Sequence, residues 1–143
     1  MPANPYAKYK QMEVTTTDPL KLVVMLYDGA IIALKRAIEH IDNGDYMAKF
    51  KQLSKANDII FELMASLDKD RGGEIATNLQ ALYTYMLTRI MAANSSLDTS
   101  ILEEVITLLD NLNGSWKELA KRRGIDANHE SANVSFAGKE KTP

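Results

Sequence analysis

Side chains that could carry out catalysis are few in this chain of 143 residues, and their spacing does not form a site. There is no cysteine, which excludes thiolate nucleophiles, thiolate metal ligands and disulfides. The two histidines are His40 and His129, and neither stands three positions after a glutamate, as a di-iron helical bundle requires. Gly72 and Gly73 lack the lysine and hydroxyl residue of a phosphate-binding loop. We therefore predict no catalytic residue, no metal site and no cofactor, in a protein that is not an enzyme.

Composition excludes two further classes of protein. The formal net charge is −2 and the sequence pI is about 5.7, whereas nucleic-acid-binding domains are usually far more basic. No run of 18 apolar residues could span a membrane, and the first residues contain no apolar run of the kind found in signal peptides. We therefore expect a cytoplasmic protein that neither binds nucleic acid nor inserts into a membrane.

The positions of proline and glycine predict long helices. Prolines stand at positions 2, 5, 19 and 143, so residues 20–142 contain none, and helix interiors exclude proline. Asp18 before Pro19 is a helix start, Ser100 to Glu103 has the pattern of a capping box, and Gly124 after three basic residues is a helix stop. Together with the turn residues between them, these signals predict helices over about 19–43, 45–69, 74–94 and 100–123.

Apolar residues recur at alternating spacings of three and four in each predicted helix, as they do in helices that pack together. In the second helix the row is Tyr46, Phe50, Leu53, Ile60, Met64 and Leu67, with the polar Asn57 in the same row, and in the third it is Ile75, Leu79, Leu82 and Met86. Short connections favour antiparallel neighbours, so we predict an all-α fold, an antiparallel up-down four-helix bundle over 18–123. We expect 1–17 to be a cap segment with one short helix and a connector, and 124–143 to be a disordered tail.

Two of the predicted helices lack charge where a solvent-facing helix would carry it. The first is apolar around most of its circumference, and between Ile75 and Leu97 the only charged residue is Arg89. One interpretation is that these helices form the buried centre of the bundle or an oligomer interface. The other is a groove that receives amphipathic helices of a partner, since small residues let a second backbone approach closely.

The groove interpretation names a set of partner-binding residues in three places. An apolar stripe near the N-terminus is expected to dock weakly on the first helix and to move when a partner binds. The candidates are Tyr6, Tyr9 and Met12 in that stripe, Leu22, Met25, Leu26, Gly29 and Ala33 in the first helix, and Thr77, Ala81, Thr84 and Thr88 in the third.

The segment from Val14 to Ile31 resembles the signature of the flagellar export chaperone family FliS. The resemblance is most specific in the final heptapeptide, Met-Leu-Tyr-Asp-Gly-Ala-Ile, and extends over residues 5 to 120 with further matches at 59–68, at 72–86 and at Trp116. Thr16 and Asp18 replace the family's usual alanine and serine, and both substitutions keep the chemistry of a connector and a helix cap.

This resemblance implies a cytoplasmic chaperone without ATPase activity. Members of the family bind the disordered C-terminal segment of flagellin, prevent its premature polymerisation and deliver it to the flagellar type III export gate. A co-chaperone or regulator is a further partner for the same surface, and the chain itself would be a monomer or weak homodimer. The alternative from another class is a homo-oligomeric structural bundle or adaptor that has no flagellin client.

Overall fold

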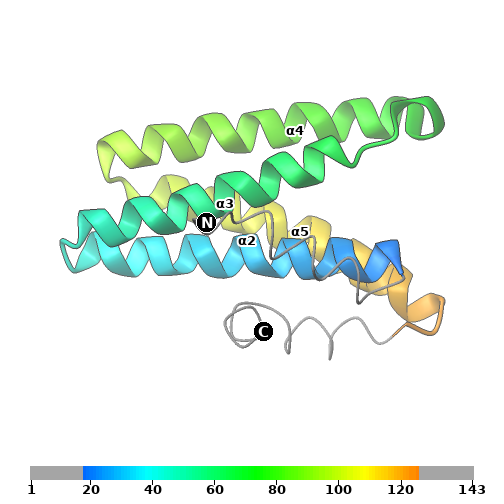
Figure 1. Cartoon of the computed structure of the whole chain (residues 1–143), viewed down its shortest axis with the longest axis horizontal. Coiled ribbons are helices and arrows are strands. Elements are labelled where there is room, and N and C mark those ends of the chain that lie inside the picture. The colour runs from blue at the N-terminus through cyan, green and yellow to red at the C-terminus, as the bar shows by residue number, and fades with distance from the viewer. Residues whose placement is uncertain (1–17, 126–143) are drawn as a thin grey trace, which may run out of the picture.

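Four long helices lie side by side in the computed structural model, which describes residues 18–125 (Figure 1). The connections between successive helices lie at alternate ends, so the predicted all-α, up-down four-helix bundle is confirmed. The predicted cap segment and nearly all of the predicted tail lie outside the described residues. The helices are α2 (Pro19–Asp42), α3 (Tyr46–Ala65), α4 (Lys69–Ser96) and α5 (Thr99–Arg122).

An aspartate caps the N-terminus of every described helix. Each carboxylate accepts a hydrogen bond from a backbone N–H of the first turn, which would otherwise have no partner. The four caps are Asp18, Asp45, Asp68 and Asp98. The start predicted at Asp18 is confirmed, whereas the capping box predicted at Ser100 is wrong. The Asp98 carboxylate accepts from the Ser100 N–H at 2.9 Å and starts α5 earlier.

Glycines end two of the helices in the same way. Gly44 and Gly124 both have φ of +74°, the left-handed conformation that glycine adopts without steric cost. After α5, the Gly124 N–H donates to the carbonyl of Lys121 and the Ile125 N–H donates to the carbonyl of Ala120. This pair of bonds is the Schellman motif, and it confirms the predicted helix stop at Gly124.

The turn between α3 and α4 does not lie at the predicted glycine pair. Instead α3 ends at Ala65 and α4 begins at Lys69, because the Asp68 carboxylate caps the Arg71 N–H at 3.1 Å. The glycine pair lies inside α4, where Gly73 has φ of +53° and ψ of −126° and breaks the helical geometry. Gly73 therefore marks a kink that separates the first turn of α4 from the long helical part that follows the glycine pair.

The core is centred on α2, which packs against α3 and α5, while α4 packs against α3 and α5. Tyr27 on α2 and Tyr83 on α4 are both buried and share a hydrogen bond of 2.6 Å between their hydroxyls. Burial raises the pKa of both phenols. The largest fully buried side chains come from all four helices: Tyr27, Tyr83, Leu34, Ile59, Ile60, Leu63, Met86, Ile90, Leu102, Leu109 and Val24.

A polar link and a small apolar cluster hold α5 against α2. The Asn113 side chain is buried and donates to the Asp28 carboxylate at 2.7 Å, and the Lys117 ammonium lies 3.4 Å from the same oxygen. At the end of the bundle where the described chain begins and ends, a second cluster packs the two helices together (Figure 1). Its members are Leu20, Val24 and Ala120, with Trp116, Leu119 and Ile125 partly buried against them.

Candidate protein-binding surface

Large apolar side chains are exposed on α3 and α4, and among the described residues on neither α2 nor α5. Their exposed fractions lie between 42% and 75%, far above those of core residues. These side chains are Tyr46, Met47, Phe50 and Phe61 on α3 and Ile75, Tyr85 and Met91 on α4. Single exposed apolar residues are normal on protein surfaces, but two of these seven, Phe50 and Met91, line one pocket between the two helices.

A second row of residues along α3 explains part of this exposure. Met47, Phe50, Ser54, Asn57 and Phe61 are spaced alternately by three and four positions, so they follow one side of the helix. This row runs beside the core row and leaves the aromatic and methionine side chains partly exposed. A row with this spacing is the kind that packs against another helix.

The predicted core rows therefore need correction at three positions. The spacing predicts Tyr46 and Phe50 in the core row of α3 and Ile75 in that of α4, yet half or more of each side chain is exposed. Phe50 belongs to the second row of α3. Its spacing from Met47 and Ser54 fits that row as well as its spacing from Tyr46 and Leu53 fits the core row. Ile75 lies in the first turns of α4 just after the break at Gly73, and the core cluster does not include it.

A pocket of about 100 Å³ lies between α3 and α4. Leu53 and Ile90 are buried and form its floor, whereas Phe50 and Met91 are more than half exposed and form its rims. We call this pocket with its rims the α3–α4 groove. Its lining residues are Phe50, Leu53, Ser54, Asn57, Ile90, Met91 and Asn94.

The α3–α4 groove has a polar centre. The Oδ1 atoms of Asn57 and Asn94 are buried, and neither has a hydrogen-bond partner. The backbone carbonyl of Asn94 accepts from the buried Lys49 ammonium at 3.0 Å, which lies 5.7 Å from the centre of the Tyr46 ring. A buried acceptor without a partner costs about 1–3 kcal/mol, so these two amides lower the free energy of unfolding.

Beside the groove, the outward side of α4 is uncharged and built from small residues. Thr77, Ala81, Thr84 and Thr88 are all exposed, as the sequence predicted for a face open to a partner. Each threonine hydroxyl donates to a carbonyl of its own helix, at 2.9–3.2 Å, so the face requires no hydrogen bond from a partner. We call these four residues the α4 outer face.

The one charged residue of this part of α4 is engaged by α5. The Arg89 Nε donates to the Glu104 carboxylate at 2.9 Å, and the Tyr85 hydroxyl donates to the other carboxylate oxygen. These two hydrogen bonds hold the pKa of Glu104 below its usual range. These two contacts join α4 to α5 and hold the Arg89 guanidinium against α5, away from the α4 outer face.

The candidate residues on α2 lie in a different environment from the one predicted. Met25, Leu26, Gly29 and Ala33 are buried, and Leu22 is half-buried. The expectation of an open apolar face was therefore wrong for those four, and the alternative interpretation, the buried centre of the bundle, holds for α2. Binding of a partner at α2 stays a prediction, and Tyr6, Tyr9 and Met12 lie outside the described residues.

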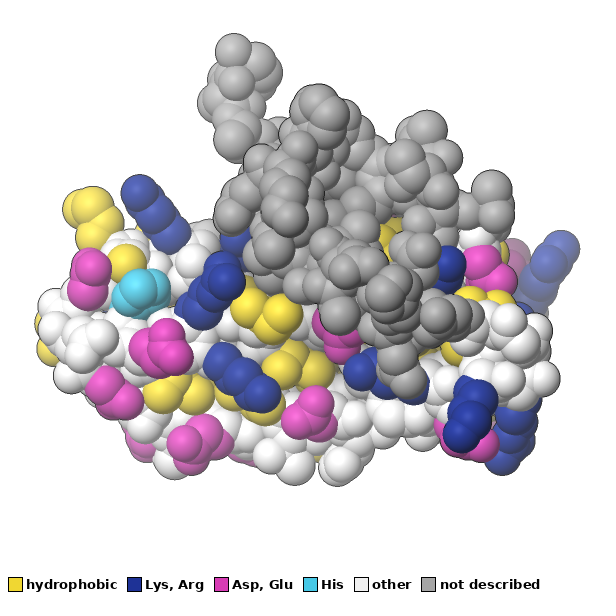
Figure 2. Space-filling model, turned by 90° about the horizontal axis from the view of Figure 1, so that it is seen from below, with side chains coloured by type: hydrophobic (Ala, Val, Ile, Leu, Met, Phe, Trp, Pro, Cys, Tyr) yellow, Lys and Arg dark blue, Asp and Glu magenta, His cyan; other side chains and the backbone are white. Residues whose placement is uncertain are grey.

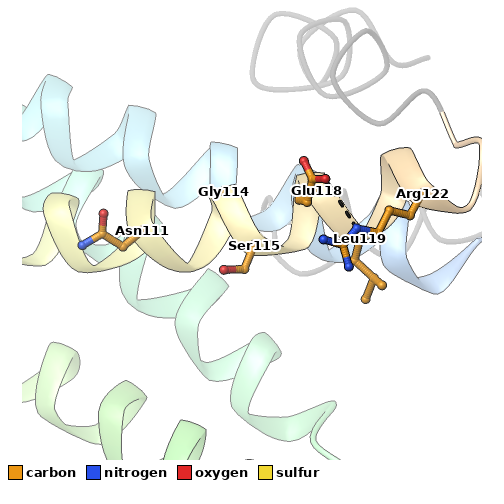
Figure 3. A pocket seen from close by; sticks show the side chains of 6 residues that line it. All are labelled: Asn111, Gly114, Ser115, Glu118, Leu119 and Arg122. Carbon is orange, nitrogen blue, oxygen red and sulfur yellow. Dashed lines mark ion pairs between the residues drawn. The ribbon is translucent and has the colours of Figure 1, made fainter.

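A second hollow follows one side of α5 and is lined by that helix alone among described residues (Figure 3). An ion pair at 3.4 Å between Glu118 and Arg122 lies at one end of it. Gly114 borders the hollow, and a Cβ at this position would meet nothing within 4 Å. The lining residues, Asn111, Gly114, Ser115, Glu118, Leu119 and Arg122, are mostly polar, so this hollow lacks the apolar rims of the α3–α4 groove.

Charge is mixed on the face of the bundle opposite to α4. The face shown in Figure 2 carries basic and acidic side chains interspersed over its described part, without a patch of one sign. Residues 18–125 contain no cluster of three or more side chains that could hold a metal ion. Within the same range, no helix is both long and apolar enough to cross a membrane.

A helical bundle with a closed core and an apolar groove between two of its helices is typical of proteins that bind a helix of another protein. Comparison with known proteins defines the family. Residues 2–123 match the family described as flagellar protein FliS, and the chain belongs to that family. The resemblance seen in the sequence is thereby confirmed over most of the chain.

Three relatives show how far the similarity extends, and each is named flagellar secretion chaperone FliS. The protein of Salmonella typhimurium strain LT2 is 46% identical over 110 residues, which are 76% of this chain and 82% of the relative. The Escherichia coli K12 protein is 41% identical over 106 residues, covering 73% and 78%. The Bacillus subtilis 168 protein is 36% identical over 115 residues, covering 80% and 85%.

Proposed function

We propose that this chain is a flagellar secretion chaperone that acts in the cytoplasm. It binds the C-terminal segment of flagellin, prevents premature polymerisation and delivers the client to the flagellar export gate. Membership of the FliS family and the names of the relatives support the chaperone role. The chain does this by stoichiometric binding and not by enzyme catalysis.

The observation that carries this proposal is the α3–α4 groove. Its rims, Phe50 and Met91, are exposed although the floor is closed by the core, so apolar surface is available without unfolding the bundle. An amphipathic helix of the client lies in such a groove with its apolar side down. A second helical piece of the client packs on the α4 outer face, where small side chains permit close approach.

The mechanism follows from the state of the client. A disordered segment orders as it binds, which offsets part of the gain from burying apolar area, so the client must cover a large surface. Because much of the interaction free energy is spent in this way, release to the export gate needs no chemical step. The buried α2 residues Met25, Leu26, Gly29 and Ala33 would join the interface only after a rearrangement that exposes them.

Calorimetry with two forms of the client tests the proposal. Full-length flagellin should bind this chain with a stoichiometry of one to one, and flagellin without its C-terminal segment should release no heat of binding. Equal binding of both forms would show that the C-terminal segment is not the site of recognition.

Solution mass distinguishes the competing structural role. A homo-oligomeric bundle would cover the same apolar surface with further copies of itself, and its mass would rise with concentration. We expect a monomer at micromolar concentration and a one-to-one complex when flagellin is added. A stable oligomer that ignores flagellin would support the alternative.

A further inference from the structure

The two halves of α4 are held in the bundle to different degrees. The second half, residues 83–96, buries the side chains of Tyr83, Met86, Ile90 and Ala93. In the first half, residues 69–82, Ala76 is the only described residue that is buried, while Leu79 and Leu82 are partly buried against the core. Since burial of apolar area supplies most of the free energy that keeps a helix docked, the first half is held weakly.

Polar contacts between helices follow the same division. Tyr83, Arg89 and the backbone carbonyl of Asn94 form hydrogen bonds to α2, α5 and α3 respectively, and all three belong to the second half. Among described residues, the side-chain contacts of residues 69–82 stay within α4 and its cap, Asp68. The second half is therefore tied to each of the other helices, and the first half to none of them.

The sequence of the first half lowers its stability further. Gly72 and Gly73 are poor helix formers, and Gly73 departs from helical geometry, so only one turn of helix precedes it. The stretch also has a firm boundary at each end, because α3 ends at Ala65 and the Tyr83 hydroxyl is bonded to Tyr27. A weakly held stretch between two firm boundaries can open without the rest of the domain.

We propose that residues 69–82 unfold and refold as one unit while the remainder of the bundle stays folded, and that a client on the α4 outer face binds only the folded form of this unit. The second part rests on the proposed function, because it concerns the client of that face. Thr77 and Ala81 of the α4 outer face belong to the unit, whereas Thr84 and Thr88 lie in the half that stays docked. The face is complete only when the unit is folded, so the client and the unit stabilise one another.

Because the chain has no cysteine, thiol labelling is a specific test of local opening. Ala76 and Ala93 are buried alanines of the same helix, one in each half, so Ala76→Cys and Ala93→Cys form a matched pair. We expect Ala76→Cys to react with an aromatic disulfide reagent about 100-fold faster than Ala93→Cys. Low concentrations of urea should scarcely accelerate the first reaction, since local opening exposes little surface, but should accelerate the second, which requires global unfolding.

Amide hydrogen exchange of the unchanged protein tests whether the stretch opens as a unit. The amides of residues 77–82 should share one free energy of opening, lower than that of the amides of residues 87–93. Fraying from the helix end would instead give protection that rises steadily along residues 77–82, and such a gradient would overturn the inference. This measurement needs no substitution, so it holds even if a cysteine variant does not fold.

The C-terminal segment of flagellin tests the coupling to the client. At a concentration about ten times its dissociation constant, the segment should slow the labelling of Ala76→Cys about 10-fold, because it stabilises the folded unit. The double variant Ala76→Cys/Ala81→Arg is the control, since the arginine blocks the α4 outer face. At the same concentration of segment, its labelling should slow less than about 2-fold.

The outcomes separate this inference from the proposed function. Equal labelling rates at positions 76 and 93, with the same dependence on urea, would show that only global unfolding exposes Ala76 and would overturn the unit. If Ala76→Cys reacts faster but the bound segment does not slow it, the client does not pack on this half of α4 and the coupling is wrong. If the segment does not bind at all, the proposed function fails and the coupling with it, whereas the labelling rates still decide whether the unit exists.

Discussion

The hydrogen bond between Tyr27 and Tyr83 is the most deeply buried polar contact that spans the bundle. It joins the central helix to α4 at 2.6 Å, and the Tyr27 ring also meets the edge of Trp116 with 6.3 Å between ring centres. Because the hydroxyls satisfy one another, two polar groups are buried at little cost. Loss of one hydroxyl would leave the other without its partner.

This pair predicts that folding stability falls at alkaline pH. Burial raises the pKa of both tyrosines in the folded state, so above the unfolded value of about 10 the unfolded chain releases phenolic protons that the folded chain keeps. Stability is therefore full below pH 10 and declines as pH rises, by up to about 1.4 kcal/mol per pH unit for each tyrosine. Urea unfolding between pH 8 and 11 measures the slope.

Tyr83→Phe identifies the source of that slope. The variant should be less stable by about 1–3 kcal/mol at neutral pH, since Tyr27 loses its partner, and its decline above pH 10 should be shallower. Tyr46→Phe, at an exposed tyrosine of α3, is the matched control for loss of a hydroxyl. A slope that Tyr83→Phe leaves unchanged would assign the alkaline effect to other groups.

Single residues show which local features were predictable from the sequence. The helix cap at Asp18 and the helix stop at Gly124 were predictable, because each depends on a few neighbouring residues and on rules that every helix obeys. The exposure of Phe50 and Ile75 was not predictable. A spacing of three and four places a residue on one side of a helix but does not say which sides other helices cover. Which side is buried depends on the other three helices.

At the scale of the element, α4 combines a broken start with an uncharged outer face. The glycine pair was predicted as a joint between helices, and Gly73 does interrupt the helical geometry, but the turn after α3 lies earlier, before Lys69. The uncharged side of α4 is exposed, and its binding of a partner stays a prediction, whereas on α2 the absence of charge results from burial. The sequence alone could not distinguish an exposed uncharged face from a buried helix, because charged residues are absent from both.

Two glycines should respond in opposite directions to alanine. Gly73 has φ of +53° and ψ of −126°, a conformation closed to other residues, so Gly73→Ala should destabilise by about 1–3 kcal/mol. Gly114 lies inside α5 with open space around it, so Gly114→Ala should stabilise by about 0.5–1 kcal/mol. Urea midpoints of both variants check the pair, and equal effects would contradict it.

Arginine at Ala81 tests the α4 outer face. Ala81 is exposed, so Ala81→Arg should change the free energy of unfolding by no more than about 0.5 kcal/mol. If a client helix packs there, the guanidinium blocks close approach and binding should weaken by about 2 kcal/mol, or about 30-fold. Thermal melts and calorimetry with flagellin provide the two measurements.

Thr107→Arg on the exposed side of α5 is the matched control, because it adds the same charge to another helix of the bundle. It should leave binding unchanged. An unaltered affinity of Ala81→Arg would place the client away from the α4 outer face, and a lost fold would show that the face is part of the core.

At the scale of the whole molecule, the described core closes at Ile125. Removal of residues 126–143 should therefore change the melting temperature by no more than about 2–4 °C, the shift that corresponds to about 1 kcal/mol in a domain of this size. Truncation after Gly124 also removes Ile125 from the cluster with Leu20 and Val24, so it should lower the melting temperature further. A fall of 10 °C on removing 126–143 alone would mean that the tail packs on the bundle.

That terminal cluster has a consequence for the order of the helices along the chain. Leu20 at the start of α2 and Ile125 just after α5 pack in one cluster. The last described helix therefore lies beside the first, just as α3 lies beside α2. The four described helices thus form a closed ring, in which the first and last described residues, Asp18 and Ile125, lie at the same end of the bundle. A short linker that joins residue 125 directly to residue 18, in place of the residues outside this range, would permit circular permutation with new ends at the Gly44 turn and the α3–α4 groove intact.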